Sequence, residues 1–290
     1  MIFEDFFASD TSIYGFPPLR FLKEGYLFIR LNKKFTKMMG PLYKPSRTRL
    51  SIDLTYSCNL KCPSCCRSCS QAPADEFISV SQVEKFIKES LKLNKKWERI
   101  DLIGGEPTLH PQFMEIFNLL YGYKMEHARE TAIRLRSNMA TAEYKAIKDK
   151  LPGDVVVKYQ PKTAEFFNRN YYAFNVAPAD LPMMGRMALE NGCLITAKCG
   201  IGLNKYGFYI CGNGASIDRI FGFNVGRKKI PSVKDDMRDQ MSLLCRYCGA
   251  FHRCFEMMNM GRPYNKFAIS SSWKVAYGKY AQKHPPLTLY

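Results

Sequence analysis

The sequence predicts an α/β fold built from parallel strand–helix–strand units, followed by a smaller cysteine-rich module. Segments of alternating apolar residues at 50–56, 97–107, 131–138 and 154–160 indicate strands, and segments with helical spacing of apolar residues lie between them. Strands that alternate with helices in this way are typical of parallel sheets. Beyond about residue 185, Gly, Cys and aromatic residues replace this alternation.

Composition limits the class of protein. The chain has 290 residues, 46% of them apolar and 24% charged, which is an ordinary globular composition with enough length for a sizeable core. The sequence contains no run of about eighteen apolar residues, so it predicts no membrane-spanning helix. The segment "MIFEDFFASD" does not resemble a secretory signal. We therefore expect a cytoplasmic location, where eleven cysteines are better metal ligands than disulfide partners.

The charge balance favours an anionic partner. The chain has 43 Lys and Arg against 26 Asp and Glu, a net charge of +17. Nucleic acid, a phosphorylated metabolite, an acidic peptide and a membrane surface would all respond to such a field, and a solvated basic face is the simpler alternative.

Residues 1–49 form a basic, aromatic N-terminal extension. Nine Lys or Arg and one acid, Glu24, lie between Arg20 and Arg49. The stretch "FLKEGYLFIRLNKKFTKMMG" is amphipathic, so peripheral membrane contact is one interpretation. More often such a stretch packs its apolar face on the domain that follows.

The units of the fold follow in order from residue 50. The strand 50–56 leads directly to Cys58, and Ser81 with Glu84 predicts a capping box for the first helix. The second strand ends in a Gly-Gly turn, and Pro111 suits the start of the next helix. The third strand 131–138, the helix 141–151 and the fourth strand complete the series.

Three chemically distinctive segments come just after strands. These are Cys58, Gly104–Glu106 and Ser137–Asn138. Because ligands of parallel α/β folds gather at the carboxyl ends of the strands, we expect the three segments to meet at one edge.

The first cysteine group has the spacing Cys58-x3-Cys62-x2-Cys65, with Cys66 and Cys69 close behind. A disulfide staple does not suit a long chain in a reducing compartment. Structural zinc usually takes two spaced pairs of ligands. Three thiolates on one loop instead favour three corners of a 4Fe–4S cluster, with the fourth iron open to another ligand.

The motifs "TYSCNLKCPSC", "IGGEPTLHP" and "IRLRSN", in this order, resemble the radical S-adenosylmethionine (radical SAM) superfamily. The resemblance implies a partial parallel (β/α)6-type barrel over residues 50–185. Ser64 stands where the family usually has an aromatic residue before the third cysteine, and Met139 stands where Gly is common.

The resemblance also implies the roles of the first site. Cys58, Cys62 and Cys65 would bind three irons, and S-adenosylmethionine would chelate the fourth. One-electron reduction would then cleave the sulfonium to a 5′-deoxyadenosyl radical that removes a hydrogen atom from the substrate. A reductant such as flavodoxin or ferredoxin is implied. Cys66 and Cys69 are candidate hydrogen-atom donors, or small buried residues.

The cofactor contacts are assigned in the same way. The amino group of S-adenosylmethionine would meet Gly104, Gly105 and Glu106, because glycine permits close backbone approach and a carboxylate accepts from an ammonium. Ser137 and Asn138 would reach its ribose or its carboxylate.

A second group of six cysteines lies in residues 186–258, before a basic tail at 259–290. Its members are Cys193, Cys199, Cys211, Cys245, Cys248 and Cys254. The group resembles the SPASM and twitch modules that hold auxiliary 4Fe–4S clusters, although Met258 replaces one cysteine of the full SPASM pattern. A single cluster on Cys193, Cys211, Cys245 and Cys248 is the favoured assignment. Cys199 and Cys254 are rivals for those places; two clusters with open irons, or zinc at "CRYC", are the alternatives.

These features together predict a radical SAM enzyme that oxidises or otherwise modifies an anionic small, sugar- or nucleotide-like substrate. The alternative within the superfamily is a peptide- or protein-modifying maturase, although 49 residues before the first strand are few for a leader-binding domain. A non-catalytic iron–sulfur or zinc protein that binds nucleic acid is the alternative of another class. We expect no nucleic acid, because no recognised nucleic-acid motif occurs and a Gly-Gly-Glu turn serves no purpose in such a module.

Overall fold

The structure, a computed structural model, describes residues 17–159, 173–191, 193–254 and 268–290. The described strands form one six-stranded sheet in the order β4-β3-β2-β1-β5-β6. The strands are β1 (Arg49–Asp53), β2 (Arg99–Ile103), β3 (Ala132–Ser137), β4 (Val156–Tyr159), β5 (Ile201–Asn204) and β6 (Gly207–Tyr209). All neighbours pair in parallel except β5 and β6, so the predicted α/β class with a parallel sheet is confirmed.

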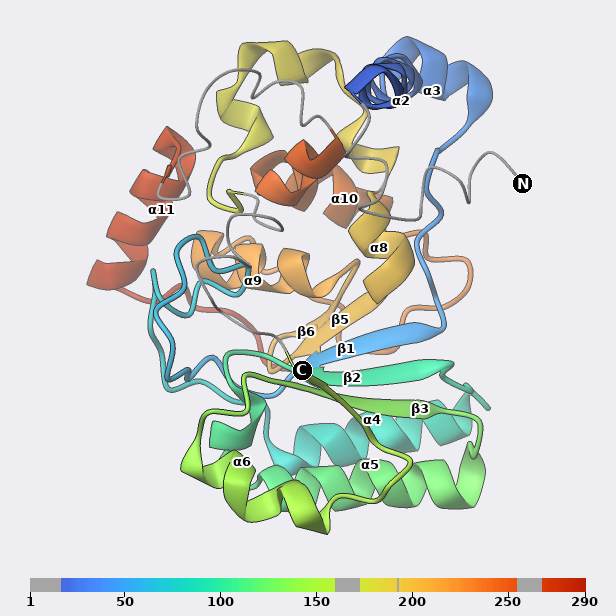
Figure 1. Cartoon of the computed structure of the whole chain (residues 1–290), viewed down its shortest axis with the longest axis vertical. Helices are drawn as coiled ribbons and strands as arrows, with labels where there is room; N and C mark the ends of the chain where they lie inside the picture. The colour runs from blue at the N-terminus through green and yellow to red at the C-terminus, as the bar shows by residue number, and fades with distance from the viewer. Residues whose placement is uncertain (1–16, 160–172, 192, 255–267) are drawn as a thin grey trace.

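Helices lie on both faces of the sheet. The α-helices are α2 (Pro17–Arg30), α3 (Lys33–Met39), α4 (Val80–Lys92), α5 (Phe113–His127), α6 (Ala142–Ile147), α8 (Leu194–Cys199), α9 (Gly212–Phe221), α10 (Arg238–Leu244) and α11 (Ser271–Gln282). The 3₁₀ turns are η2 (Pro107–Leu109), η3 (Lys148–Lys150), η4 (Pro178–Asp180), η5 (Pro182–Arg186), η6 (Leu189–Asn191), η7 (Cys245–Tyr247) and η8 (Gly249–Cys254). Helices α4, α5 and α6 lie on one side of the sheet, and α8 and α9 lie on the other (Figure 1).

The main core lies between the sheet and the helices α4 and α5. Alternate residues of the central strands, such as Leu50, Ile100 and Ile133, pack there with Phe86 and Phe117. A side chain on the other face of a strand points away from this core, because successive side chains alternate.

Helix α4 begins earlier than the sequence predicts. The capping box is formed by Ser79 and Gln82, whose side chains each bond the other's backbone N–H, and not by Ser81 and Glu84. Both pairs have the same spacing, but Ser79 has the extended backbone that an N-cap needs and follows the buried Ile78.

β5 and β6 form an antiparallel hairpin in the cysteine-rich region. However, β5 pairs with β1, through Leu50, Ser51 and Ile52, so the sheet continues across residue 185 into the cysteine-rich region. The sequence alone gives no sign of this pairing, because it joins segments about 150 residues apart.

The basic tail contains structure that the sequence analysis missed. Helix α11 buries Trp273, Ala276 and Tyr280, which share one helical face, in a second apolar cluster with residues of the cysteine-rich region. The spacing of these three residues was the available signal.

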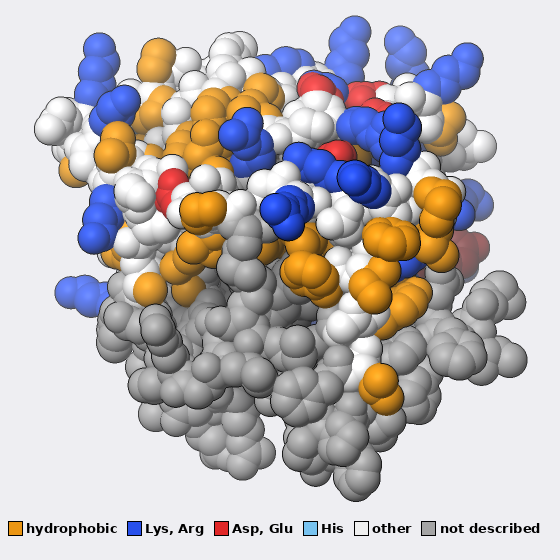
Figure 2. All heavy atoms as spheres, turned by 90° about the horizontal axis from the view of Figure 1, so that it is seen from above, with side chains coloured by type: hydrophobic (Ala, Val, Ile, Leu, Met, Phe, Trp, Pro, Cys, Tyr) orange, Lys and Arg blue, Asp and Glu red, His pale blue; other side chains and the backbone are white. Residues whose placement is uncertain are grey.

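The N-terminal extension packs partly on the rest of the chain. Leu27 and Leu31 are buried with Met184, Met187 and Phe251. Other large apolar side chains of α2 and α3 are exposed; these are Leu22, Tyr26, Phe28, Ile29, Phe35, Met38 and Met39. Figure 2, which views the molecule from this end, shows Lys and Arg side chains with hydrophobic ones beside them and few acidic ones. None of the described helices has the length and apolarity to cross a membrane.

Gly200 is required where α8 turns into β5. Its φ is 74°, in the left-handed region that favours glycine, and an added Cβ would lie 2.2 Å from the Arg49 carbonyl oxygen. We expect Gly200→Ala to lower the free energy of unfolding by roughly 2–5 kcal/mol, because it adds left-handed strain to a backbone clash. Urea denaturation of the metal-free chain would measure this.

The matched control is Gly122→Ala in α5, where an added Cβ meets nothing within 4 Å. This change should leave stability unchanged or raise it by up to about 1 kcal/mol, because Ala has the better helix propensity. Equal effects of the two changes would contradict the assignment of strain to Gly200.

Candidate functional site

Three strand ends meet at one edge of the sheet, as the sequence predicts. The backbone N–H of Gly105 donates to the Thr55 carbonyl at 2.7 Å, and that of Glu106 donates to the Ser57 carbonyl at 2.9 Å. From β3, the Asn138 side-chain amide donates to Asn59 Oδ1 at 2.8 Å. The segments after β1, β2 and β3 are therefore tied directly to one another.

The two glycines are needed for this contact. A Cβ on Gly104 would lie 2.3 Å from the Thr55 carbonyl oxygen, and one on Gly105 would lie 2.2 Å from that of Ser57. The φ of Gly104 is 144°, in the region that favours glycine. In the structure these glycines serve the approach of two backbone segments, a use that the sequence analysis did not foresee.

Glu106 is buried and its carboxylate joins β2 to β3. Its Oε1 accepts from Ser137 Oγ and Thr108 Oγ1, both at 2.8 Å, and its Oε2 accepts from the Asn138 N–H at 2.9 Å. Only 1% of Glu106 is exposed, so these donors replace the water that the carboxylate would lose. An oxygen accepts up to two donors, and Oε2 can accommodate one more.

The cysteine loop after β1 holds the three cysteines of the first motif. Cys58, Cys62 and Cys65 are all half-buried. A hydrogen bond from the Cys69 thiol lowers the pKa of Cys65 to about 6, against the effect of burial. The Cys65 sulfur is therefore disposed to the thiolate form that binds metal.

Neighbouring residues fix the shape of this loop. Ser64 has a φ of 50°, and its hydroxyl accepts from the Asn175 N–H at 3.2 Å, so it serves the loop backbone in the place of the family's aromatic residue. The candidate hydrogen-atom donors differ in their surroundings. Cys69 is buried against Cys65, whereas the Cys66 sulfur lies 3.6 Å from Nη1 of Arg67. Their catalytic role stays a prediction.

Arg219 of α9 holds the end of the cysteine loop and was missed by the sequence analysis. Its guanidinium donates to the carbonyls of Arg67 and Ala72, at 3.1 and 3.3 Å, and to Tyr280 Oη at 2.7 Å. Its Cζ also lies 4.2 Å from the centroid of the Tyr56 ring. A planar fork between aromatic rings is a geometry that Arg provides and Lys does not.

A second buried arginine lies between the two cysteine groups. Arg67 pairs with Asp53 at 2.8 Å, and its Nη1 donates to Asn213 Oδ1 at 2.9 Å. The Asn213 side-chain amide in turn lies 3.9 Å from the Cys248 sulfur. Burial raises the pKa of Asp53 and Arg67 opposes that shift, so each member of the pair offsets the desolvation of the other.

Four of the six later cysteines surround one apolar pocket. Cys193, Cys211, Cys245 and Cys248 all line it, and its empty volume is about 390 Å³. Cys211 caps the N-terminus of α9, where its sulfur accepts from the Gly214 N–H at 3.4 Å. The set that lines the pocket is the set that the spacing favours as ligands.

Burial in this pocket disfavours the thiolate form of three of its cysteines. Burial raises the pKa of Cys211 to about 12. The pKa values of Cys245 and Cys248 are well above the usual range, from burial and from the neighbouring thiols. An apolar pocket with four sulfurs therefore favours thiolates only when cations are bound there.

The two rivals stand apart from this set. Cys199 ends α8, does not line the pocket, and its carbonyl accepts from Ser51 Oγ at 3.4 Å. The side chain of Cys254 lies outside the described residues. Within the described part of the chain, no three His, Cys, Asp or Glu side chains are grouped around a single ion position.

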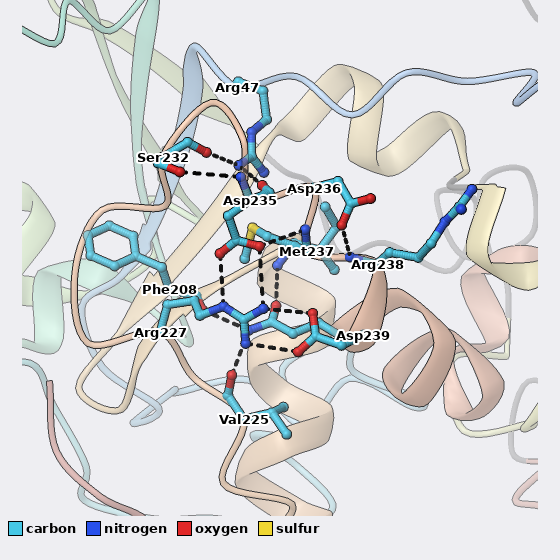
Figure 3. A network of polar contacts seen from close by, with 12 residues as sticks. Arg47, Phe208, Val225, Arg227, Ser232, Asp235, Asp236, Met237, Arg238 and Asp239 are labelled. Carbon is cyan, nitrogen blue, oxygen red and sulfur yellow. Dashed lines mark hydrogen bonds and ion pairs between the residues drawn. The ribbon is translucent and has the colours of Figure 1, made fainter.

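A polar network positions the helix that leads to Cys245 (Figure 3). Arg227 donates to Asp235 at 3.0 Å and to Asp239 at 2.7 Å, across the start of α10. Arg47, which lies just before β1, donates to the Ser232 carbonyl at 3.0 Å. This bond joins the start of β1 to the loop that precedes α10. Hydrogen bonds from Arg227 lower the pKa of both aspartates.

Comparison with known proteins gives partial matches. The chain is 33% identical over 79 residues to the probable GTP 3′,8-cyclase of Pyrococcus horikoshii, covering 27% of this chain and 24% of that protein. It is 32% identical over 69 residues to the GTP 3′,8-cyclase of Actinobacillus pleuropneumoniae, covering 23% and 20%. The matched region therefore spans a quarter or less of these curated relatives. These matches support the resemblance to the radical SAM superfamily.

Among solved structures, BtrN in complex with AdoMet and 2-DOIA is similar with a TM-score of 0.43 and 13% identity, over 72% of this chain and 90% of that chain. BtrN in an open conformation has a TM-score of 0.38 and the same identity. No protein-family model matches the chain.

The stabilising effect of the Arg219 hydrogen bonds can be tested in the metal-free protein. Arg219→Lys keeps the charge but loses the fork, so we expect the free energy of unfolding to fall by roughly 2–4 kcal/mol. Residues 65–72 should also exchange their amide hydrogens faster. Denaturation and hydrogen exchange of the metal-free chain would measure both. Arg129→Lys, at an exposed position, should change the free energy of unfolding by less than about 0.5 kcal/mol. An equally small effect of Arg219→Lys would refute the role of Arg219 in stabilising the cysteine loop.

Proposed function

We propose that this member of the radical SAM superfamily is an enzyme whose first site binds a 4Fe–4S cluster through Cys58, Cys62 and Cys65. The bound cluster and S-adenosylmethionine together supply the reductive cleavage that starts hydrogen abstraction from a substrate. A flavodoxin or ferredoxin is the proposed class of electron donor.

One observation carries this proposal. The cysteine loop, the Gly104–Glu106 turn and the Ser137–Asn138 strand end are hydrogen-bonded to one another at the carboxyl edge of a parallel sheet. Ligands of such sheets bind at this edge. The chemistry of the donors fits as well, since three half-buried cysteines lie on one loop and a hydrogen bond from Cys69 lowers the pKa of Cys65.

The residues of the chain would position the cofactor. Glu106 holds Ser137 and Asn138 in place and keeps one acceptor position on Oε2, which suits an ammonium group. Gly104 and Gly105 hold this turn against the cysteine loop. The amino group of S-adenosylmethionine is therefore assigned to the turn after β2.

The second site is proposed to hold one auxiliary 4Fe–4S cluster on Cys193, Cys211, Cys245 and Cys248. The shared pocket and the four sulfurs support this assignment. One cluster of this kind would accept the electron released when a substrate radical is oxidised, or would anchor the substrate. Residues 50–185 would then carry the first site and residues 186–258 most of the second.

The proposed substrate is an anionic small molecule of the sugar or nucleotide kind. The net charge of +17 favours an anion, and the curated relatives are named for a reaction of GTP, itself a polyanion. A peptide-modifying activity is the second candidate, since an acidic peptide would meet the same charge. Binding of nucleic acid without catalysis is the third.

Cys62→Ala tests the first site. We expect it to abolish the slow formation of 5′-deoxyadenosine by the anaerobically reconstituted and reduced protein, because only two of the three proposed ligands, Cys58 and Cys65, remain. Chromatographic assay of 5′-deoxyadenosine would measure the loss. Cys199→Ala, which removes a thiol outside both sites, should retain the activity. Formation of 5′-deoxyadenosine by Cys62→Ala would refute the assignment, and its absence from the unmodified protein would favour the nucleic-acid alternative.

Cys211→Ala tests the second site. The reconstituted protein should carry about eight irons and the variant about four, because each 4Fe–4S cluster holds four. Iron analysis with Mössbauer spectroscopy would count them. The variant should still cleave S-adenosylmethionine slowly while substrate turnover ends. About four irons in both proteins would remove the auxiliary cluster and leave these cysteines to zinc or to structure.

A further inference from the structure

One face of the sheet carries an unusual group of charged residues. Ile100 and Leu102 of β2 and Leu135 of β3 point into the main core with α4 and α5. Their neighbours along each strand therefore point to the opposite face. The parallel register places Asp101 opposite Arg134, and Arg136 opposite Lys158. This second face of β2, β3 and β4 is thus lined by charged side chains in adjacent rows.

Asp101 is the carboxylate at the centre of this group. Nε of Arg134 lies 2.7 Å from its Oδ1, and Nε of Arg99 lies 3.0 Å from its Oδ2. Nη2 of Arg136 lies 3.6 Å from Oδ2, beyond ordinary hydrogen-bond length. Arg99 also donates to the Lys198 carbonyl at 2.6 Å. Arg99 and Arg134 are therefore well paired, whereas Arg136 is weakly held.

The charges of the group do not balance. Three guanidiniums share one carboxylate that is 1% exposed, which leaves an excess of two positive charges before Lys158 is counted. The other buried carboxylate of this face, Asp53, is already paired with Arg67. The Arg136 side chain is 22% exposed, so its charge is partly desolvated yet open to a ligand. A partly buried excess of this kind is stabilised by a bound anion.

The position of the excess points to the reaction site. Arg136 directly precedes Ser137, whose hydroxyl donates to Glu106 at the turn assigned to S-adenosylmethionine. Lys158 is exposed next to it at the carboxyl end of β4. An anion held by Arg136 and Lys158 would place the molecule that carries it beside the cofactor residues.

We propose that Arg136 and Lys158, with Arg134 set behind them by Asp101, bind a phosphate group of the substrate. A phosphate ester carries close to two negative charges near neutral pH, which offsets most of the excess of three that results when Lys158 is included. The planar fork of Arg suits two phosphate oxygens, and Lys adds a point charge. This inference rests on the proposed function and narrows its substrate to a phosphorylated small molecule.

Isothermal titration of the reconstituted protein with inorganic pyrophosphate, at fixed low salt, tests the site. We expect saturable binding that Arg136→Gln weakens by at least about tenfold, because a charge-assisted pair is lost. Lys158→Gln should weaken binding by about two- to fivefold, as expected of a more exposed charge. Because Lys158 is exposed, its variant remains informative if Arg136→Gln does not fold.

Arg129→Gln is the matched control, since it removes one positive charge from an exposed position elsewhere. Equal weakening by all three variants would mean that pyrophosphate responds to net charge alone, which would overturn the site. Absence of binding to the unmodified protein would overturn it too. Binding of a glutamate-rich peptide in place of pyrophosphate, with the same dependence on Arg136, would overturn the phosphate assignment in favour of a peptide substrate.

The same preparation separates this inference from the proposed function. If the unmodified protein forms 5′-deoxyadenosine but binds no pyrophosphate, the phosphate site is wrong and the enzyme stands. If it binds pyrophosphate through Arg136 but forms no 5′-deoxyadenosine, the anion site stands and the proposed chemistry is wrong.

Discussion

The parallel pairing of β1 with β2 on one side and β5 on the other determines where the cysteine loop, the turn after β2 and the hairpin before Cys211 lie. β1 leads into the cysteine loop, β2 into the Gly104–Glu106 turn, and β5 into the hairpin that ends at Cys211. Parallel strands present their carboxyl ends at one edge, so the pairing alone brings the first two segments together. The hairpin of β5 and β6 leads through Cys211 into α9, which lies on the other face of the sheet. This places the two cysteine groups near each other.

Buried polar residues occupy the space between the two cysteine groups. Arg67 contacts Asp53 on one side and Asn213 on the other, and Arg219 bonds the carbonyls at the end of the cysteine loop. Apolar residues would fill this space at lower desolvation cost. However, they would leave the loop carbonyls without donors, and unpaired buried carbonyls destabilise a fold. The arginines therefore follow from having an irregular, cysteine-bearing loop inside the protein.

Local patterns predicted much of this architecture. The alternation of strands and helices, and the arrival of Cys58, Glu106 and Ser137 at one edge, follow from periodicity and the rules of parallel sheets. The four cysteines at the pocket follow from spacing together with the family resemblance. The roles of Arg67 and Arg219 could not be predicted, because each depends on partners more than a hundred residues away. The pairing of β5 with β1 was hidden for the same reason, whereas the Ser79 cap and the face of α11 were legible in the sequence and were missed.

Helix α9 has one end at each site. Cys211 caps its N-terminus at the apolar pocket, and Arg219 reaches the carbonyls of the first cysteine loop from its last turn. Arg219 follows Cys211 by eight positions, which corresponds to a rise of about 12 Å along a continuous helix. A displacement of the Cys211 sulfur when the pocket binds metal would therefore shift Arg219, and with it the loop carbonyls that Arg219 contacts. If both proposed centres are filled, α9 would connect them, and filling one would then alter the shape of the site that the other cluster meets.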